Sequence, residues 1–228
     1  MKMDGMRKHT RDFGKGGLLL AIAFASQGCG GSSGGASDGG LVQATTCSGT
    51  YKACGGDPTG TWDIASLCAE GDWVGAYNEE MAAQVPACGS AFTSVKPAGS
   101  GSVTYAAGNV TFNATTKLAA SVTYTPACFS AAYSGLASSA SACSQAEAGF
   151  NSAPATAGSA TCSYAGVNCS CSTTIAKNNT TSGSYTISGS TITESSGDTY
   201  DFCVNGNTMT EREQATGSAY AVTTLRRH

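Results

Sequence analysis

The chain is short of the large apolar side chains that usually fill a protein core. Of the 200 residues after residue 28, only 24 are leucine, isoleucine, valine or phenylalanine, which is below the roughly 20% at which disorder is expected. Against disorder stand a low net charge and ten cysteines spread from residue 47 to residue 203. Each disulfide contributes about 2–4 kcal/mol, mainly by restricting the unfolded chain. We therefore expect a single domain stapled by disulfides, not a disordered tail.

Basic residues and histidine are also scarce. Residues 29–228 hold seven lysines and arginines against thirteen aspartates and glutamates, a formal charge of −6. Nucleic-acid binding relies on basic contacts to phosphates, and docking to anionic lipid relies on basic clusters, so we expect neither. The single histidine in this part is His228, which argues against a Ser-His-Asp triad. We expect no enzymatic activity, with a hydrolase as the remaining alternative.

The first 28 residues have the layout of a bacterial lipoprotein signal peptide. Residues 1–17 carry a net charge of +3, and residues 18–25 form an apolar run. This run is much too short to span a bilayer, because a membrane-spanning helix needs about 20 residues. Gly28 supplies the small residue before Cys29. We expect cleavage before Cys29 and anchoring through a diacylglyceryl group and palmitate-type chains, with plain secretion as the alternative. Gly30, where aspartate would retain the protein in the inner membrane, suggests the outer membrane, on its periplasmic or surface face.

The remaining ten cysteines are an even number in an exported chain, which predicts five disulfides. They are Cys47, Cys54, Cys68, Cys88, Cys128, Cys143, Cys162, Cys169, Cys171 and Cys203. We expect one disulfide-rich β domain at residues 47–228, behind a flexible Gly/Ser linker at residues 29–46. The pairs we expect are Cys54–Cys68 and Cys128–Cys143.

Cys162, Cys169 and Cys171 could instead be thiolate ligands of a metal ion. Zinc sites favour C-x-x-C pairs in reducing compartments, and no histidine lies near these residues in the sequence. Oxidised structural cysteines are therefore the better interpretation, and no metal or cofactor is expected. Residues i and i+2 of a strand point to the same face, so Cys169 and Cys171 should bridge to different partners.

Short runs rich in Thr, Val, Tyr and Ile alternate with turn residues, a pattern typical of antiparallel all-β proteins. A repeat supports hairpins, because residues 187–194 (ISGSTITE) match residues 204–211 (VNGNTMTE) at a spacing of 17. One hairpin used twice indicates an up-and-down meander. The expected strands are 60–67, 102–106, 109–114, 117–125, 170–176, 183–188, 190–195, 199–204, 207–213 and 218–225.

Two stretches follow a helical period instead. Larger residues recur at steps of three and four through residues 126–150, which predicts one amphipathic helix inserted in the meander. In residues 71–86, Trp73, Tyr77 and Met81 are four apart, which predicts a short helix or lid. The carboxylates at residues 79–80 and at 198 and 201 are interpreted as solvated charges rather than as acid/base pairs.

Gly60-Thr-Trp62, followed by a meander of short strands, resembles the G-x-W motif of the calycin group of lipocalin-like barrels. The resemblance implies a mainly all-β, antiparallel barrel in which the tryptophan closes one end and stacks against an arginine from a late strand. The implied pair is Trp62–Arg212. The arrangement of cysteines and glycines over residues 54–210, including Cys169-Ser-Cys171, is similar to that of predicted cysteine-rich lipoproteins of large-genome Gram-negative bacteria. That resemblance implies a compartment and a fold, but no reaction.

Two functions of different class follow. The first is a structural or interaction module of the cell envelope, a monomer whose partner is an envelope protein or glycan. The alternative is a lipocalin-like carrier of one small apolar ligand, with Trp73 and Tyr77 near the mouth, because a barrel of about eight strands leaves room for at most one. The scarcity of large aliphatics favours the first, since an apolar cavity needs apolar walls.

Overall fold

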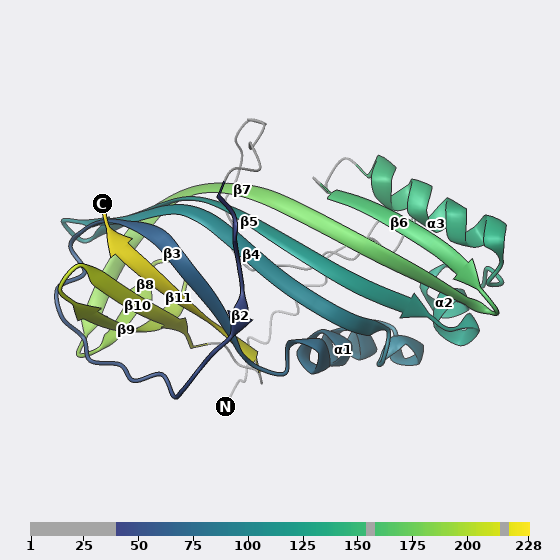
Figure 1. Ribbon diagram of the computed structural model, residues 1–228, viewed down its shortest axis with the longest axis horizontal. Helices are drawn as coiled ribbons and strands as arrows, with labels where there is room; N and C mark the ends of the chain where they lie inside the picture. Colours follow the sequence, from purple (N-terminus) through teal and green to yellow (C-terminus); the bar gives the residue numbers. More distant parts are fainter. Residues whose placement is uncertain (1–39, 154–157, 215–218) are drawn as a thin grey trace, which may run out of the picture.

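Eight strands of the chain form a closed ring in which every neighbouring pair is antiparallel (Figure 1). The computed structural model describes residues 40–153, 158–214 and 219–228, so the expected signal peptide and Cys29 lie outside the described residues. The order around the ring follows the chain, as the predicted meander requires. In that order the strands are β3 (Gly60–Gly71), β4 (Phe92–Ala106), β5 (Asn109–Tyr124), β7 (Asn168–Ser188), β8 (Thr191–Glu194), β9 (Thr199–Asn205), β10 (Thr208–Glu213) and β11 (Ala219–Arg227), which returns to β3.

Residues 42–46 complete the sheet where the first two ring strands part. β3 and β4 pair directly only between residues 60–63 and 102–105. Beyond that point β1 (Val42–Gln43) pairs with β4, and β2 (Thr45–Thr46) pairs in parallel with β3. The expected linker at residues 29–46 therefore extends too far, because its last residues belong to the sheet. Strands of two residues have no periodicity that a sequence could show.

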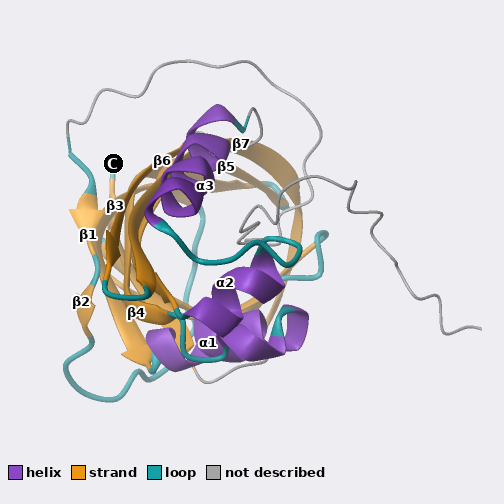
Figure 2. Cartoon of the chain, turned by 90° about the vertical axis from the view of Figure 1, so that its right-hand side faces the viewer, coloured by secondary structure: helices purple, strands orange, loops and turns teal. Residues whose placement is uncertain are grey.

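The strands differ in length, and this difference gives the molecule two ends. β4, β5 and β7 have 15, 16 and 21 residues, whereas β8, β9 and β10 have four, seven and six. The long strands continue beyond the ring, where β6 (Gly158–Ala165) pairs with β7 (Figure 1). The helices gather at this second end (Figure 2): α1 (Trp73–Gln84), η1 (Pro86–Cys88), α2 (Pro126–Ala132) and α3 (Ala140–Ser152). We call the two parts the ring end and the helix end.

Each end has its own buried core. The ring-end core consists of large side chains, namely Trp62, Val103, Tyr105, Val110, Ile192, Phe202, Met209 and Leu225. The helix-end core combines larger residues with five alanines and five cysteines. The larger residues are Met81, Val85, Phe92, Val122, Tyr124 and Phe129; the others are Ala91, Ala120, Ala132, Ala142, Ala146, Cys88, Cys128, Cys143, Cys169 and Cys171. The thin core expected from the composition is therefore a property of one end only.

The strand predictions erred mainly by interrupting long strands. Residues 109–114 and all but the last of residues 117–125 belong to the single strand β5, and residues 170–176 and 183–188 belong to β7. The first part of β4 was not expected, since Pro97, Gly99 and Gly101 break its pattern. Gly101 has a φ of 120°, and a side chain there would collide with the backbone of Asn113, so the glycine is required for this strand to pass β5. β6 was also not expected, because it is composed mostly of small residues.

The helix predicted for residues 126–150 is two helices. Thr125 and Ser139 each accept a hydrogen bond from a backbone N–H in the first turn of α2 and α3, respectively. Ser134 and Gly135, between the helices, both have positive φ. The helix predicted within residues 71–86 is confirmed as α1, which Asp72 caps. Within the described ranges, no helix is long and apolar enough to cross a membrane.

All ten expected cysteines form disulfides, and the prediction of five is confirmed. The pairs are Cys47–Cys68, Cys54–Cys203, Cys88–Cys128, Cys143–Cys169 and Cys162–Cys171. The expected pairs Cys54–Cys68 and Cys128–Cys143 are wrong. Cys54 lies along β9, where its N–H donates to the carbonyl of Phe202 and so places it beside residue 203. Residues 128 and 143 lie in different helices. Cys169 and Cys171 take different partners, as predicted.

Candidate functional site

Trp62 closes the ring at the end where β3 begins. Its side chain is fully buried, and its indole N–H donates to the carbonyl oxygen of Pro58 at 2.7 Å. The guanidinium carbon of Arg227 lies 4.3 Å from the tryptophan ring centroid, within cation–π range, and Nη1 of Arg227 donates to the carbonyl of Thr59. Gly60 has a φ of 134°, and a Cβ there would meet Nη1 of Arg227 at 2.8 Å. The positive φ therefore favours glycine at the first position of the G-x-W motif, and the absence of a side chain there leaves room for the guanidinium group of Arg227.

The expected pair Trp62–Arg212 is wrong, because Arg212 lies on the outer face of the ring. Met209 and Glu211 are buried on the inner side of β10, and alternation along a strand turns Arg212 outward. There its guanidinium carbon lies 5.3 Å from the ring centroid of Tyr51 and 5.5 Å from that of Tyr220. Arg212 also forms ion pairs with Glu70 and Asp201 on the same outer face, at 3.5 and 3.6 Å.

A hydrogen bond crosses the interior of the ring. The hydroxyl of Tyr105 on β4 donates to Oε1 of Glu211 on β10 at 2.7 Å, and both residues are buried. β4 and β10 are not neighbours in the sheet, so this bond spans the inside. Tyr185 of β7 packs against Tyr105, with ring centroids 5.0 Å apart in an edge-to-face arrangement.

A second carboxyl group faces the same interior. Glu194 follows Ile192 by two residues on β8, as Glu211 follows Met209 on β10, and Ile192 and Met209 belong to the ring-end core. Residues two apart on a strand share a face. Oε1 of Glu194 is shielded from solvent, and no donor among the described residues reaches it. Tyr200 of β9 lies close enough that the charges of both glutamates affect its pKa. We call Glu194, Glu211, Tyr105, Tyr185 and Tyr200 the inner carboxyl cluster.

Burial sets the protonation of this cluster. It raises the pKa of Glu211 from the ordinary value of 4.5 to about 7, while the hydrogen bond from Tyr105 acts in the opposite direction. Burial also raises the pKa of Glu194 to about 7, and the charges of Asp198 and Glu211 add to the rise. The pKa of Tyr105 and Tyr200 is raised as well, first by burial and then by neighbouring carboxylates. No cation in the described part of the chain contributes to the pKa of either glutamate.

The sequence contained a signal for the two carboxyl groups. Glu194 and Glu211 are the last residues of the two copies of the 17-residue repeat. In the structure the copies are the hairpins β7–β8 and β9–β10, whose loops begin with Gly189 and Gly206, with φ of 61° and 59°. Each copy of the repeat therefore places one buried apolar residue, Ile192 or Met209, and one carboxyl group, Glu194 or Glu211, on the inner face of the ring. The sequence prediction recognised the hairpins but not this consequence.

Trp73 and Tyr77 were expected near a ligand mouth. The indole N–H of Trp73 donates to the carbonyl of Tyr220 on β11 at 3.3 Å, and its ring stacks on Tyr77 with centroids 6.3 Å apart. Tyr77 in turn packs against Phe92, with centroids 5.4 Å apart, and joins the helix-end core. In the described residues, the contacts of this aromatic pair run to β11 and the helix end and not to the inner carboxyl cluster.

One sulfur group has ligand-like spacing. The Sγ atoms of Cys143, Cys162 and Cys169 lie within 4.8 Å of one another. Each of these sulfurs is held in a disulfide, so the oxidised chain offers no thiolate ligand at this place.

Comparisons with protein-family models, curated proteins and solved structures found no significant match to this chain.

Proposed function

We propose that this chain is a binding module whose strand ring, a calycin-like barrel, takes up one small molecule at the inner carboxyl cluster. The observation that carries the proposal is a pair of inward-facing carboxyl groups, Glu211 fully buried and Glu194 half-buried, neither of which has a cation among the described residues to pair with it. Burying a carboxyl group is costly, and a ring with a purely structural role would be filled by apolar side chains. A bound ligand gives these groups a partner.

The chemistry of the cluster favours a ligand with a protonated amine. A carboxylate beside a bound ammonium group recovers the free energy that it loses on burial. The rings of Tyr105, Tyr185 and Tyr200 add aromatic faces and edges, which attract cations and flat organic groups. This modifies the expectation of a purely apolar ligand. At this cluster we propose binding and not catalysis, without a metal or cofactor.

The proposal keeps the envelope location expected from the sequence. Cys29, with its diacylglyceryl group, would anchor the module to the outer membrane, and the stretch before β1 would hold it away from the lipid. The five disulfides support an oxidising compartment. Intact-mass measurement of protein from its own host tests the anchor: a mature chain beginning at residue 29 with attached acyl groups is expected, and an unmodified Cys29 would contradict it.

A matched pair of probes tests the binding site. Phenethylamine and its neutral counterpart phenethyl alcohol differ in the group that would meet the carboxylates. We expect calorimetric titration at about pH 8, where both glutamates are charged, to detect the amine and to give at least about tenfold weaker binding of the alcohol. Glu211→Gln and Glu194→Gln should each weaken amine binding, whereas Glu79→Gln on the exposed face of α1 should not. Equal binding of both probes to all variants would contradict the proposal.

A structural or interaction module remains the second candidate. It is favoured by the packing of the ring end, where Trp62, Ile192, Phe202 and Met209 are fully buried and fill the interior beside the carboxyl cluster. Native mass spectrometry of protein purified from its own host distinguishes the two. A small molecule that co-purifies with the wild-type chain and is lost from the Glu211→Gln variant supports binding, whereas a bound envelope protein or glycan supports the second candidate.

A further inference from the structure

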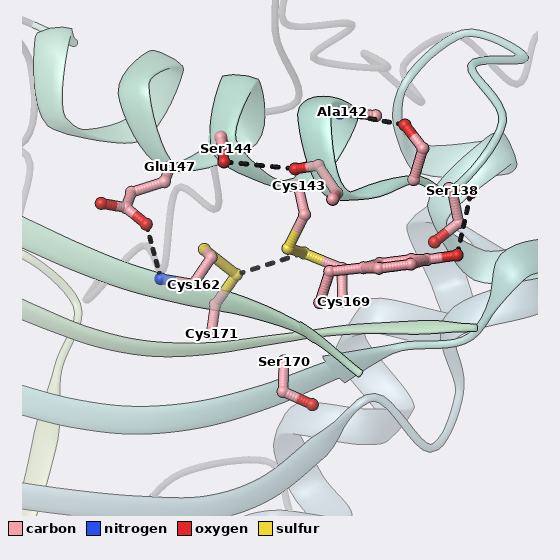
Figure 3. The surroundings of a disulfide bond; sticks show 12 residues. Ser138, Ala142, Cys143, Ser144, Glu147, Cys162, Cys169, Ser170 and Cys171 are labelled. Carbon is pink, nitrogen blue, oxygen red and sulfur yellow. Dashed lines mark hydrogen bonds between the residues drawn. A yellow bond between two sulfur atoms is a disulfide. The ribbon is translucent and has the colours of Figure 1, made fainter. Parts of the chain in front are cut away.

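Two disulfides of the helix end lie in contact with each other. Cys143–Cys169 joins α3 to β7, and Cys162–Cys171 joins β6 to β7 (Figure 3). The Sγ atoms of Cys169 and Cys171 are 3.9 Å apart, and those of Cys143, Cys162 and Cys169 lie within 4.8 Å of one another. Four sulfurs from three elements therefore lie side by side. We call them the four-sulfur cluster.

One separation in the cluster, between the sulfurs of Cys169 and Cys171, matches that of a tetrahedral thiolate site. A zinc–sulfur bond of about 2.3 Å places the sulfurs of a tetrahedron about 3.8 Å apart. The separation of Cys169 and Cys171 already has this value. On reduction the two bonded pairs would have to open to this distance, and the non-bonded separations among Cys143, Cys162 and Cys169, which are up to 4.8 Å, would have to close by up to about 1 Å. Rotation about the Cα–Cβ bonds moves a sulfur by such amounts.

The frame around the cluster does not depend on the two disulfides alone. Cys162 and Cys171 are opposite each other in the β6–β7 ladder. The side chain of Asn151 on α3 exchanges two hydrogen bonds with the backbone of Ala160 on β6, at 3.0 and 2.6 Å. Glu147 of α3 accepts a third, from the N–H of Cys162 at 2.7 Å (Figure 3). These bonds keep α3 over the hairpin when the sulfurs are reduced.

We propose that reduction converts the four-sulfur cluster into a binding site for one soft divalent cation, with zinc as the expected ion. Two dithiol molecules each pass two electrons and two protons to one disulfide and are themselves oxidised to disulfides. The four thiols then lose up to four protons as their sulfurs bind the ion. Cysteine sulfur selects zinc-like ions over magnesium and calcium. Cys162 is the least buried of the four, so reduction begins at its disulfide.

Thiol protection tests the proposal residue by residue. The purified protein is reduced with a phosphine, which takes its oxygen from water and does not compete for the metal, and is then given one equivalent of Zn²⁺ and alkylated with a maleimide. We expect Cys143, Cys162, Cys169 and Cys171 to react at least about tenfold more slowly than the other cysteines. Peptide mass spectrometry reads each site. Protection that is absent, or that spreads over all ten cysteines, overturns the proposal.

Variants with equal numbers of cysteines provide the control. Cys169→Ser with Cys171→Ser should abolish protection of Cys143 and Cys162 and the tetrahedral thiolate absorption of bound Co²⁺. Cys47→Ser with Cys68→Ser should leave both signals unchanged. If reduction unfolds the helix end, circular dichroism decides the matter, since recovery of structure on adding Zn²⁺ supports the site and failure to recover overturns it.

Discussion

In the ring end the buried side chains are large, whereas in the helix end alanines and cysteines supply much of the core. Trp62, Tyr105 and Phe202 meet in the ring with no disulfide among them, and the two disulfides of this region tie loops to the outside of the strands. The helix end contains the other three disulfides within or beside its core. The same chain thus uses hydrophobic packing at one end and covalent bridges at the other.

The two ends also differ in the polar groups that their interiors contain. The ring end holds two carboxyl groups in its interior, Glu211 fully buried and Glu194 half-buried, and burial raises the pKa of both to about 7. The helix end gains less from hydrophobic packing, because a buried alanine contributes little transfer free energy. Besides the hydroxyl of Thr173, which donates to the carbonyl of Ala120, its core contains disulfide sulfurs, which carry no charge. Variants that remove a core side chain, a disulfide, a buried charge or a stacked arginine one at a time should therefore affect the two ends differently.

The largest effect is expected from Trp62→Ala. Removing this buried side chain should lower the free energy of unfolding by about 3–5 kcal/mol, because the cavity also releases Arg227 from its stacking partner. Urea denaturation measures the change in the free energy of unfolding. Hydrogen exchange should show that backbone amides in β8–β10 lose protection first. Exchange that increases first in α2 and α3 would contradict the separation of the two cores.

The next effect is expected from Cys88→Ala with Cys128→Ala. This disulfide closes a separation of 40 residues, so its removal should cost about 3–4 kcal/mol through the entropy of the unfolded chain. Hydrogen exchange should rise in η1 and α2 while β9 and β10 keep their protection. The matched control is Cys47→Ala with Cys68→Ala, which removes a disulfide that joins residues 21 apart outside the ring. This variant should leave the protection of η1 and α2 from hydrogen exchange unchanged. A uniform rise in both variants would show that the ends are not independent.

A pH-dependent effect is expected from Glu211→Gln. The folded pKa of Glu211 is raised to about 7 from 4.5, so its contribution to stability is present below about pH 4.5 and is lost as pH rises through about 7. Glutamine keeps an acceptor for Tyr105 without the charge. The variant should therefore exceed the wild type in unfolding free energy by about 3 kcal/mol at about pH 8, and the difference should vanish below about pH 4.5. Denaturation at the two pH values checks this, and a difference that grows toward low pH would reverse the sign.

The smallest effect is expected from Arg227→Ala. The guanidinium group stacks on Trp62 but is itself exposed, so its loss should cost about 0.5–1 kcal/mol. Arg212→Ala should leave the fluorescence of Trp62 unchanged, whereas Arg227→Ala should shift it. If Arg212→Ala gave the larger spectral shift, our assignment of the covering arginine would be wrong.

Much of the fold could be predicted from the sequence, because hairpins and strand alternation are local features. The repeat in residues 187–211 and the helix at residues 71–86 were recognisable from spacing alone. The disulfide pairs were not, since Cys54 and Cys203 meet only after the ring closes over a separation of 149 residues. The choice between Arg212 and Arg227 could have been made from the sequence: once Glu211 is assigned inward with Met209, alternation turns Arg212 outward. The hydrogen bond between Tyr105 and Glu211 could not, because its partners lie on strands that are not neighbours.

The most direct test of the account is a titration of the two inner glutamates. Carbon-13 NMR of the side-chain carboxyl groups, assigned with Glu194→Gln and Glu211→Gln, gives each pKa with and without phenethylamine. The account predicts values near 7 in the free protein and a clear fall when the amine binds, because a neighbouring cation favours the carboxylate. Values near 4.5 in the free protein, unchanged by the amine, would contradict it.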